Sequence, residues 1–348
     1  LHSAEMERDG PISGDTLFAT IGVDFGTSCT KVVIRFPYEP GSPSIAIPVP
    51  EYCRSGGDPY LWQTVLWARR DGVLLAWPEH GAVVLHSLKQ GLVSRARREV
   101  VAQADDADGV TGLEAASGYL AYVIRYTKGW LVRNQARLLR GRTVSWSVNV
   151  GLPAENYDRQ KLVALYRKAC AIALTLAFNK EGISIHSIRE TSLQSPVTQA
   201  FASQAGGEAL GVAIFPEVAA EVAGFMHSAA GADGLYLLID VGAMTLDCCM
   251  FGFARLPGAD KYLLLQAAVR HLGVEAYHWF IKEGRSHVGF CKACDETVRG
   301  VVLTTRRKRD SSESKWRIGN DLPIFFAGGG ARHSLHKKII EGLPDWVR

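Results

Sequence analysis

Two stretches of the chain repeat one pattern, and this repeat constrains the fold more than any other feature. Residues 21–36 read IGVDFGTSCTKVVIRF, and residues 237–253 read LLIDVGAMTLDCCMFGF. Each is an apolar run that ends in Asp-x-Gly, followed by a turn of small residues and a second apolar run, which is typical of a β-hairpin. More than half of the chain separates the two aspartates, Asp24 and Asp240. The repeat therefore indicates two similar lobes related by an internal duplication.

Strand and helix patterns alternate along the rest of the chain. Thr111 and Glu114 have the spacing of a capping box in front of an apolar segment, which predicts that a helix starts there. Residues 144–154 alternate as a strand does, and Pro216-Glu217 suits the first turn of another helix. Near the end of the chain a strand, the triplet Gly328-Gly329-Gly330 and a helix follow one another.

The length of 348 residues is enough for two domains. We expect a flexible lead-in over residues 1–16, a first lobe over residues 17–210 and a second lobe over residues 211–348. The sequence leaves open whether the C-terminal helix belongs to the second lobe or returns to the first. The alternation of strands and helices predicts an α/β fold.

Composition excludes several classes of protein. Hydrophobic residues make up 47% and charged residues 21% of the chain, as in soluble globular proteins. A net charge of +4 over this length is not typical of a nucleic-acid binder, so we expect no nucleic-acid partner. No apolar run is long enough to span a membrane, residues 1–16 are too polar for a secretory signal, and seven cysteines are irregularly spaced. We therefore expect a soluble, cytoplasmic protein with reduced thiols and no membrane partner.

The three glycine-bearing turns have the chemistry of phosphate-binding loops. Glycines let the backbone approach a phosphate closely and point several N–H groups at it. An aspartate at each strand end can hold Mg²⁺ through water, and the metal then bridges the phosphates. The Gly328–Gly330 triplet lies between a strand and a helix, and a helix N-terminus suits a nucleotide. Each turn by itself is most often an ordinary connection, so the ordered set of turns carries the prediction.

This ordered set resembles the actin, sugar kinase and heat-shock chaperone superfamily of nucleotide-binding folds. The likeness is greatest to the ATPase domain of DnaK-type heat-shock chaperones, over roughly residues 20–340. The matching segments are IGVDFGTSCTKV and LLIDVGAMTLD as phosphate loops, VNVGLPAEN and FPEVAAEVAGF as connecting segments, HLGVEAYHWFI after the second loop, and FFAGGGARHSL as adenosine loop. The resemblance implies a two-lobed, actin-like fold of duplicated ribonuclease H-like lobes, with a nucleotide cleft between them and no peptide-binding domain.

The resemblance also implies ligands and site residues. The ligands are ATP or ADP and Mg²⁺, and the metal is near Asp24 and Asp240, which hold it through water. The acidic residues implied to order the metal shell or the attacking water are Asp24, Glu217, Asp240 and Asp247. The residues implied to contact the phosphates are Gly26, Thr27, Ser28, Gly242 and Thr245. Those implied to flank the nucleoside are Gly328, Gly329, Gly330 and Arg332, and Pro153 is implied to lie at the interlobe hinge.

Departures from the chaperone pattern leave several functions open. The second turn reads Gly242-Ala243-Met244 where the chaperones carry three glycines, and no lysine matches their catalytic lysine. We expect a chaperone-like ATP-binding protein that is a weak Mg²⁺-dependent ATP hydrolase, with lobe closure and the binding of a protein partner set by the nucleotide. The alternatives are an actin-like polymerising or scaffolding protein that forms homo-oligomers, a pseudo-ATPase interaction module and, less favoured, a small-molecule kinase.

Two further motifs have alternative interpretations. Cys291-x-x-Cys294 with His287 could begin a metal site, but no second pair of ligands has a suitable spacing, which favours ordinary thiols. The basic run Arg306–Arg309 could bind a polyanion, whereas such runs are more often solvated loops.

Overall fold

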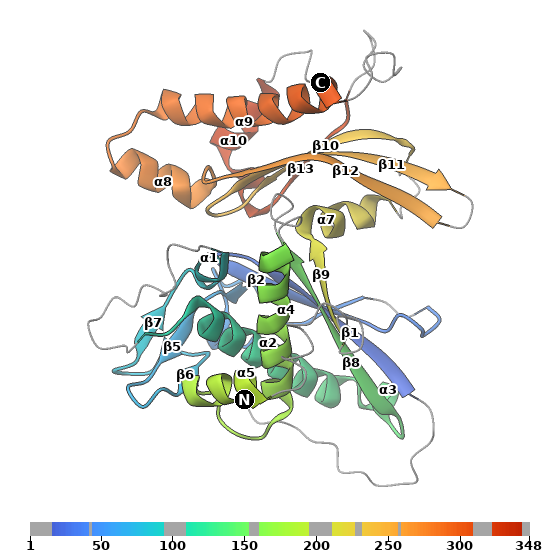
Figure 1. Ribbon diagram of the computed structural model, residues 1–348, viewed down its shortest axis with the longest axis vertical. Helices are drawn as coiled ribbons and strands as arrows, with labels where there is room; N and C mark the ends of the chain where they lie inside the picture. Colours follow the sequence, from blue (N-terminus) through green and yellow to red (C-terminus); the bar gives the residue numbers. More distant parts are fainter. Residues whose placement is uncertain are drawn as a thin grey trace. The chain divides into compact units, whose positions relative to one another are not determined.

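Helices and strands alternate in two units of the chain, which confirms the α/β class (Figure 1). The computed structural model describes residues 16–41, 44–93, 109–152, 160–194, 211–226, 232–256, 259–308 and 322–342. Unit 1 comprises residues 1–151 and 159–215, and unit 2 comprises residues 152–158 and 216–348. Among the described residues, no helix is both long enough and apolar enough to cross a membrane.

Unit 1 is built on a sheet with the strand order β3-β2-β1-β8-β9, in which β4 also pairs with β2. A smaller sheet has the order β6-β5-β7. The strands are β1 (Thr16–Phe25), β2 (Cys29–Arg35), β3 (Ile45–Ala46), β4 (Trp62–Gln63), β5 (Leu66–Ala68), β6 (Leu74–Leu75), β7 (Val83–Leu85), β8 (Thr143–Leu152) and β9 (Val212–Pro216). The helices are α1 (Leu88–Val93), α2 (Gly112–Asn134), α3 (Ala136–Leu139), α4 (Gln160–Phe178) and α5 (Ile185–Gln194), with a 3₁₀ turn η1 (Glu51–Cys53).

Side chains on one face of the main sheet of unit 1 are buried, and α2 and α4 pack together beside it. Along β1 the residues from Leu17 to Phe25 alternate between buried and more exposed positions, as a strand with one covered face does. Phe25 stacks on Tyr119 of α2, with ring centroids 5.8 Å apart. The buried Arg125 of α2 donates hydrogen bonds to the carbonyls of Leu176 (2.6 Å) and Asn179 (2.9 Å), where its positive charge suits the C-terminal end of α4.

Helix α2 starts where the capping box predicts. The Glu114 amide donates to Thr111 Oγ1 (3.2 Å), and the Thr111 amide donates to Glu114 Oε2 (2.7 Å). The other carboxylate oxygen of Glu114 accepts a hydrogen bond from Arg189 Nε of α5 (2.6 Å). One acidic side chain therefore closes the first turn of α2 and ties it to a second helix.

Unit 2 is built on a sheet with the strand order β12-β11-β10-β13. Its strands are β10 (Gly234–Val241), β11 (Leu246–Leu256), β12 (Ala259–Arg270) and β13 (Ile324–Ala327). Its helices are α7 (Glu217–Met226), α8 (Val274–Lys282), α9 (His287–Lys308) and α10 (Ser334–Glu341), with a 3₁₀ turn η4 (Gly329–Arg332). Helix α10 contacts α9 within this unit.

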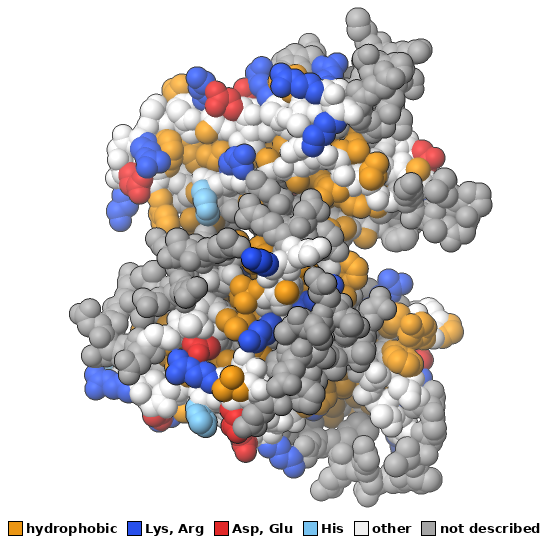
Figure 2. Space-filling view, viewed as in Figure 1, with side chains coloured by type: hydrophobic (Ala, Val, Ile, Leu, Met, Phe, Trp, Pro, Cys, Tyr) orange, Lys and Arg blue, Asp and Glu red, His pale blue; other side chains and the backbone are white. Residues whose placement is uncertain are grey.

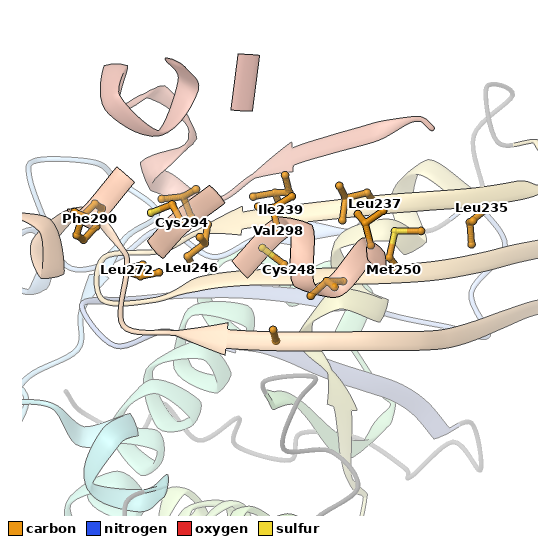
Figure 3. Close-up of a cluster of buried hydrophobic side chains, with 14 residues drawn as sticks. Leu235, Leu237, Ile239, Leu246, Cys248, Met250, Leu272, Phe290, Cys294 and Val298 are labelled. Carbon is orange, nitrogen blue, oxygen red and sulfur yellow. The ribbon is translucent and has the colours of Figure 1, made fainter. Parts of the chain in front are cut away.

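Helices cover both faces of this second sheet. On one face, Leu237, Ile239 and Cys248 of the hairpin pack against Cys294 and Val298 of α9 (Figure 3). The opposite face carries the cluster Tyr236, Leu238, Cys249, Phe251 and Phe253, which packs against Val218 and Val222 of α7. The strands β10 and β11 are apolar on both faces for this reason, so they read as near-continuous hydrophobic runs.

The two sheets share one topology. In each, the first two strands form an antiparallel hairpin, and a later strand lies parallel to the first on its other side. The pairs are β1–β2 with β8 in unit 1, and β10–β11 with β13 in unit 2. The repeat seen in the sequence therefore occupies the same place in both sheets.

The structure differs from the sequence expectations at two places and adds two elements to them. Strand β9 pairs in the main sheet of unit 1, so that unit extends to Phe215, beyond the expected boundary at residue 210. The sequence patterns over the long strand β12 and helix α9 gave no clear prediction of either element. Arg306, Arg307 and Lys308 form the last turn of α9 and not a loop, and positive charge is favourable at that end of a helix.

Replacing Thr111 with Ala removes the side-chain acceptor for the Glu114 amide. We expect the free energy of unfolding to fall by about 1 kcal/mol, because one amide at the helix start loses its partner. Urea denaturation followed by circular dichroism measures this change. Thr111→Ser keeps the hydroxyl and is expected to stay close to the wild type, and equal stability of the Ala and Ser variants would contradict the cap.

Candidate functional site

The first hairpin turn joins β1 to β2 and presents the predicted residues Gly26, Thr27 and Ser28. The Gly26 amide donates to the Asp24 carbonyl (3.1 Å). A Cβ at Gly26 would overlap the carbonyl oxygen of Cys29, so this tight turn needs glycine.

Asp24 pairs with a cation that the sequence motifs did not single out. Asp24 lies opposite Lys31 in the β1–β2 register, and Lys31 Nζ is 3.3 Å from Asp24 Oδ2. Both side chains are about half exposed, at 53% and 55% respectively. A surface ion pair of this kind contributes little to stability, so it leaves both groups free to respond to a charged ligand.

Strand β4 holds the first turn from the side. The Thr64 amide donates to the Ser28 carbonyl (2.9 Å), and Cys29 lies opposite Gln63 in the β2–β4 pairing. Below them, the buried hydroxyls of Thr30 and Thr64 are 2.9 Å apart and share a hydrogen bond. The turn therefore has a fixed backbone even though its tip is partly exposed.

The second hairpin turn joins β10 to β11 and brings two predicted carboxylates together. Asp240 lies opposite Asp247 in the register, so both side chains lie on the same face of the sheet. Each is partly buried, and the Oδ1 atom of each is inaccessible to solvent. Carboxylate oxygens gathered on one face are ligands of the kind that divalent cations such as Mg²⁺ accept.

Glu217 begins the helix that covers this face. It is the first residue of α7, and α7 packs through Val218 and Val222 on the sheet face that carries Asp240 and Asp247. Within the part of the chain that the structure describes, no three His, Cys, Asp or Glu side chains gather closely enough to hold a metal by themselves.

The N-terminus of α8 fixes the second turn. The amides of Gly273, Val274 and Glu275 donate to the carbonyls of Met244 (3.1 Å), Gly242 (3.1 Å) and Ala243 (2.7 Å), respectively. A Cβ at Gly273 would come within 2.6 Å of the Gly242 carbonyl oxygen, so glycine is needed for this contact. Met244 is buried, with 8% of its surface exposed, so its bulk does not project from the turn into solvent.

The glycine triplet packs directly on this second hairpin. Gly328 has a φ of +86°, and a Cβ there would overlap Asp240 Oδ1 and the Val241 carbonyl. A Cβ at Gly330 would lie 2.6 Å from Val241 and 2.7 Å from Val274. Gly329 has open space around it, and Arg332 is exposed at the end of η4.

Unit 2 therefore brings together most of the residues that the sequence assigned to it. These are Asp240, Gly242, Thr245 and Asp247 of the hairpin and Gly328, Gly329, Gly330 and Arg332 of the following loop. Asp24, Gly26, Thr27 and Ser28 form the corresponding hairpin end in unit 1. Pro153 lies outside the described residues.

The cysteines near these segments form no disulfides. Cys248 is fully buried beside the carboxylates, and burial, followed by the charge of Asp247, raises the pKa of its thiol well above the usual range. Cys294 of the Cys-x-x-Cys motif is buried in the core, whereas Cys291 Sγ is 3.6 Å from His287 Nε2 at the surface. All seven cysteines are free, in keeping with the expected reduced thiols.

The basic end of α9 is on the surface of unit 2. Figure 2 shows Lys and Arg atoms along the surface over this helix, which ends in Arg306, Arg307 and Lys308. Lys308 Nζ donates to Gln266 Oε1 of β12 (2.7 Å). This hydrogen bond ties the end of α9 to β12 and does not identify a ligand for the basic run.

In comparisons with known proteins, no protein-family model and no curated protein matches this sequence.

Gly328→Ala and Gly329→Ala form a matched pair that tests the packing of the triplet. We expect Gly328→Ala to lower the free energy of unfolding by about 2 kcal/mol or more, because its backbone is in the left-handed region and its Cβ has no room. Gly329→Ala has open space and is expected to change stability by less than about 0.5 kcal/mol. Thermal melts of both variants measure the difference, and equal effects would show that the loop does not sit on Asp240 as described.

Proposed function

We propose that this chain is a nucleotide-binding protein with an actin-like fold of two ribonuclease H-like lobes, closest in kind to a chaperone ATPase domain. Its ligand is ATP or ADP with Mg²⁺, the Asp-x-Gly hairpin turns are the segments suited to phosphates, and the nucleotide state governs binding to a protein partner. The observation that carries the proposal is the shared topology of the two sheets, because an Asp-x-Gly hairpin occupies the same place in each.

The charges of the two hairpins suit different groups of the proposed ligand. The Asp240–Asp247 pair offers two carboxylates on one face and suits water-mediated Mg²⁺, whereas the Asp24–Lys31 pair is neutral overall. When bound, Mg²⁺ neutralises phosphate charge and fixes the phosphates in place. Lys31 is then the group in the first hairpin that is suited to contact a phosphate oxygen.

The hydroxyls and amides of the turns complete the proposed phosphate site. Thr27 and Ser28 stand in the first turn, and Thr245 stands in the second, where hydroxyl donors suit phosphate oxygens. Gly329 has open space around it in the loop on Asp240 and Val241, so backbone there is accessible to a nucleoside. Hydrolysis also needs a positioned water molecule and stabilisation of charge on the phosphates, and we propose it to be slow because Ala243 and Met244 stand where the resembled chaperones carry glycines.

Calorimetric titration with ATP and ADP, with and without Mg²⁺, tests the proposal. We expect Mg²⁺ to strengthen ATP binding by about tenfold or more, and Asp240→Asn and Asp247→Asn to abolish most of this gain. Glu283→Gln is the control, since Glu283 is exposed and pairs only at the surface with Arg285. Failure of the wild type to bind ATP at millimolar concentration would overturn the proposal.

Lys31→Gln tests the phosphate contact separately. We expect ATP affinity to fall about tenfold, because a charge-assisted hydrogen bond to a phosphate is lost, while Lys31→Arg keeps most of the affinity. Arg35→Gln is the matched control, since Arg35 is an exposed cation on the same face of β2. Unchanged affinity in Lys31→Gln would remove Lys31 from the site and leave the rest of the proposal standing.

A further inference from the structure

His336 of α10 is a buried histidine that joins two segments of the candidate loop region. Only 1% of its surface is exposed. Its Nε2 is 2.8 Å from the Leu272 carbonyl oxygen, and its Nδ1 is 3.2 Å from His333 Nδ1. Leu272 immediately precedes Gly273, whose amide binds the second hairpin turn.

The hydrogen bonds fix the protonation state of His336. A carbonyl only accepts hydrogen bonds, so Nε2 carries the proton. In the neutral ring Nδ1 is then an acceptor, and His333 Nδ1 donates to it. A second proton on His336 would turn Nδ1 into a donor, so the bond from His333 in its present direction would be lost and a positive charge would be placed on a buried ring.

The surroundings of His336 disfavour its charged form. Helix α9 contributes the Phe290 ring, 5.9 Å from His336, and α8 contributes Tyr277 and His278, 6.0 and 6.1 Å from His333. His287 of α9 bonds the Tyr277 hydroxyl (3.0 Å). Burial lowers the pKa of His336 most, the bond to Leu272 raises it, and the neighbouring His333 lowers it further.

The bond from His336 supports the loop through a short series of contacts. Leu272 lies in the apolar core next to Phe290 (Figure 3), and the following residues Gly273, Val274 and Glu275 hold the second turn. Gly330 packs on Val241 and Val274, and the His333 amide donates to the Gly330 carbonyl (2.9 Å). Contacts of His333 and His336 therefore connect three segments, which are the glycine loop, the start of α8 and helix α10.

We propose that His336 is a positioning residue for the Gly328–Gly330 loop, and that protonation of His336 releases this loop and weakens nucleotide binding in mild acid. The inference rests on the proposed function for its effect on nucleotide, and on the geometry alone for its effect on the loop. It makes unit 2 sensitive to pH just below neutrality.

The sign of the pH dependence follows from the direction of the shift. Because the pKa of His336 is lower in the folded protein than in the unfolded chain, the unfolded chain binds more protons at pH values between the two. Stability therefore rises with pH across this window and is lost as pH falls below about 6.5, the usual value for histidine.

The test compares the wild type with His336→Gln and His336→Phe between pH 5.5 and 7.5. Gln keeps a donor for the Leu272 carbonyl but does not titrate, so we expect its melting temperature to depend less on pH than that of the wild type. Phe has no donor, so we expect faster amide exchange in residues 272–276 and 328–336 at every pH. His186→Gln is the control, since the His186 side chain is 90% exposed in α5, and it should behave as the wild type does.

Nucleotide titration at the same pH values gives the functional readout. We expect the ATP affinity of the wild type to fall about tenfold from pH 7.5 to 5.5, and that of His336→Gln to fall much less. His333 is partly exposed, so His333→Gln serves as a second variant if His336→Gln does not fold. Removing the His333 ring should also make ATP affinity depend less on pH, because this neighbour lowers the pKa of His336. The inference would be overturned if melting and amide exchange in these variants depended on pH as they do in the wild type. If the wild type binds no ATP at any pH, the proposed function fails, whereas melting and exchange still decide the role of His336 in the loop.

Discussion

The close approach of three backbone segments at the end of β10 is the constraint on which unit 2 depends. Gly273, Gly328 and Gly330 come from two segments far apart in the sequence, and each packs where a Cβ would overlap the hairpin Asp240–Ala243 or its neighbours. The start of α8 donates its amides to the turn, so the turn has one backbone conformation. This packing sets where the carboxylates, the glycine loop and the histidine pair lie.

The two hairpins share a topology but differ in charge at one register position. Lys31 stands opposite Asp24, whereas Asp247 stands opposite Asp240. The turns are also held differently, by an added strand, β4, in unit 1 and by a helix start in unit 2. One framework therefore presents a neutral pair in one unit and a pair of carboxylates in the other.

Local signals in the sequence predicted most of the helices and strands. They did not predict the contacts between segments that are far apart in the sequence. The hairpins, the Thr111 cap and the strand before the glycine triplet follow from spacing and periodicity. The pairing of Asp24 with Lys31 depends on hairpin register, which a one-residue slip would change. The bonds from Thr64 to Ser28 and from His336 to Leu272 join residues 36 and 64 positions apart, and no local pattern marks them.

The buried cysteines make the interior of both units chemically inert while the chain is folded. Burial raises the pKa of the Cys53, Cys170, Cys249 and Cys294 thiols to about 12, and that of Cys248 is raised as well. Disulfide exchange requires a thiolate, and these side chains are both protonated and shielded. Mispairing of these five thiols therefore becomes a hazard of the unfolded chain, and the rate at which each unit opens sets how quickly oxidants can reach them.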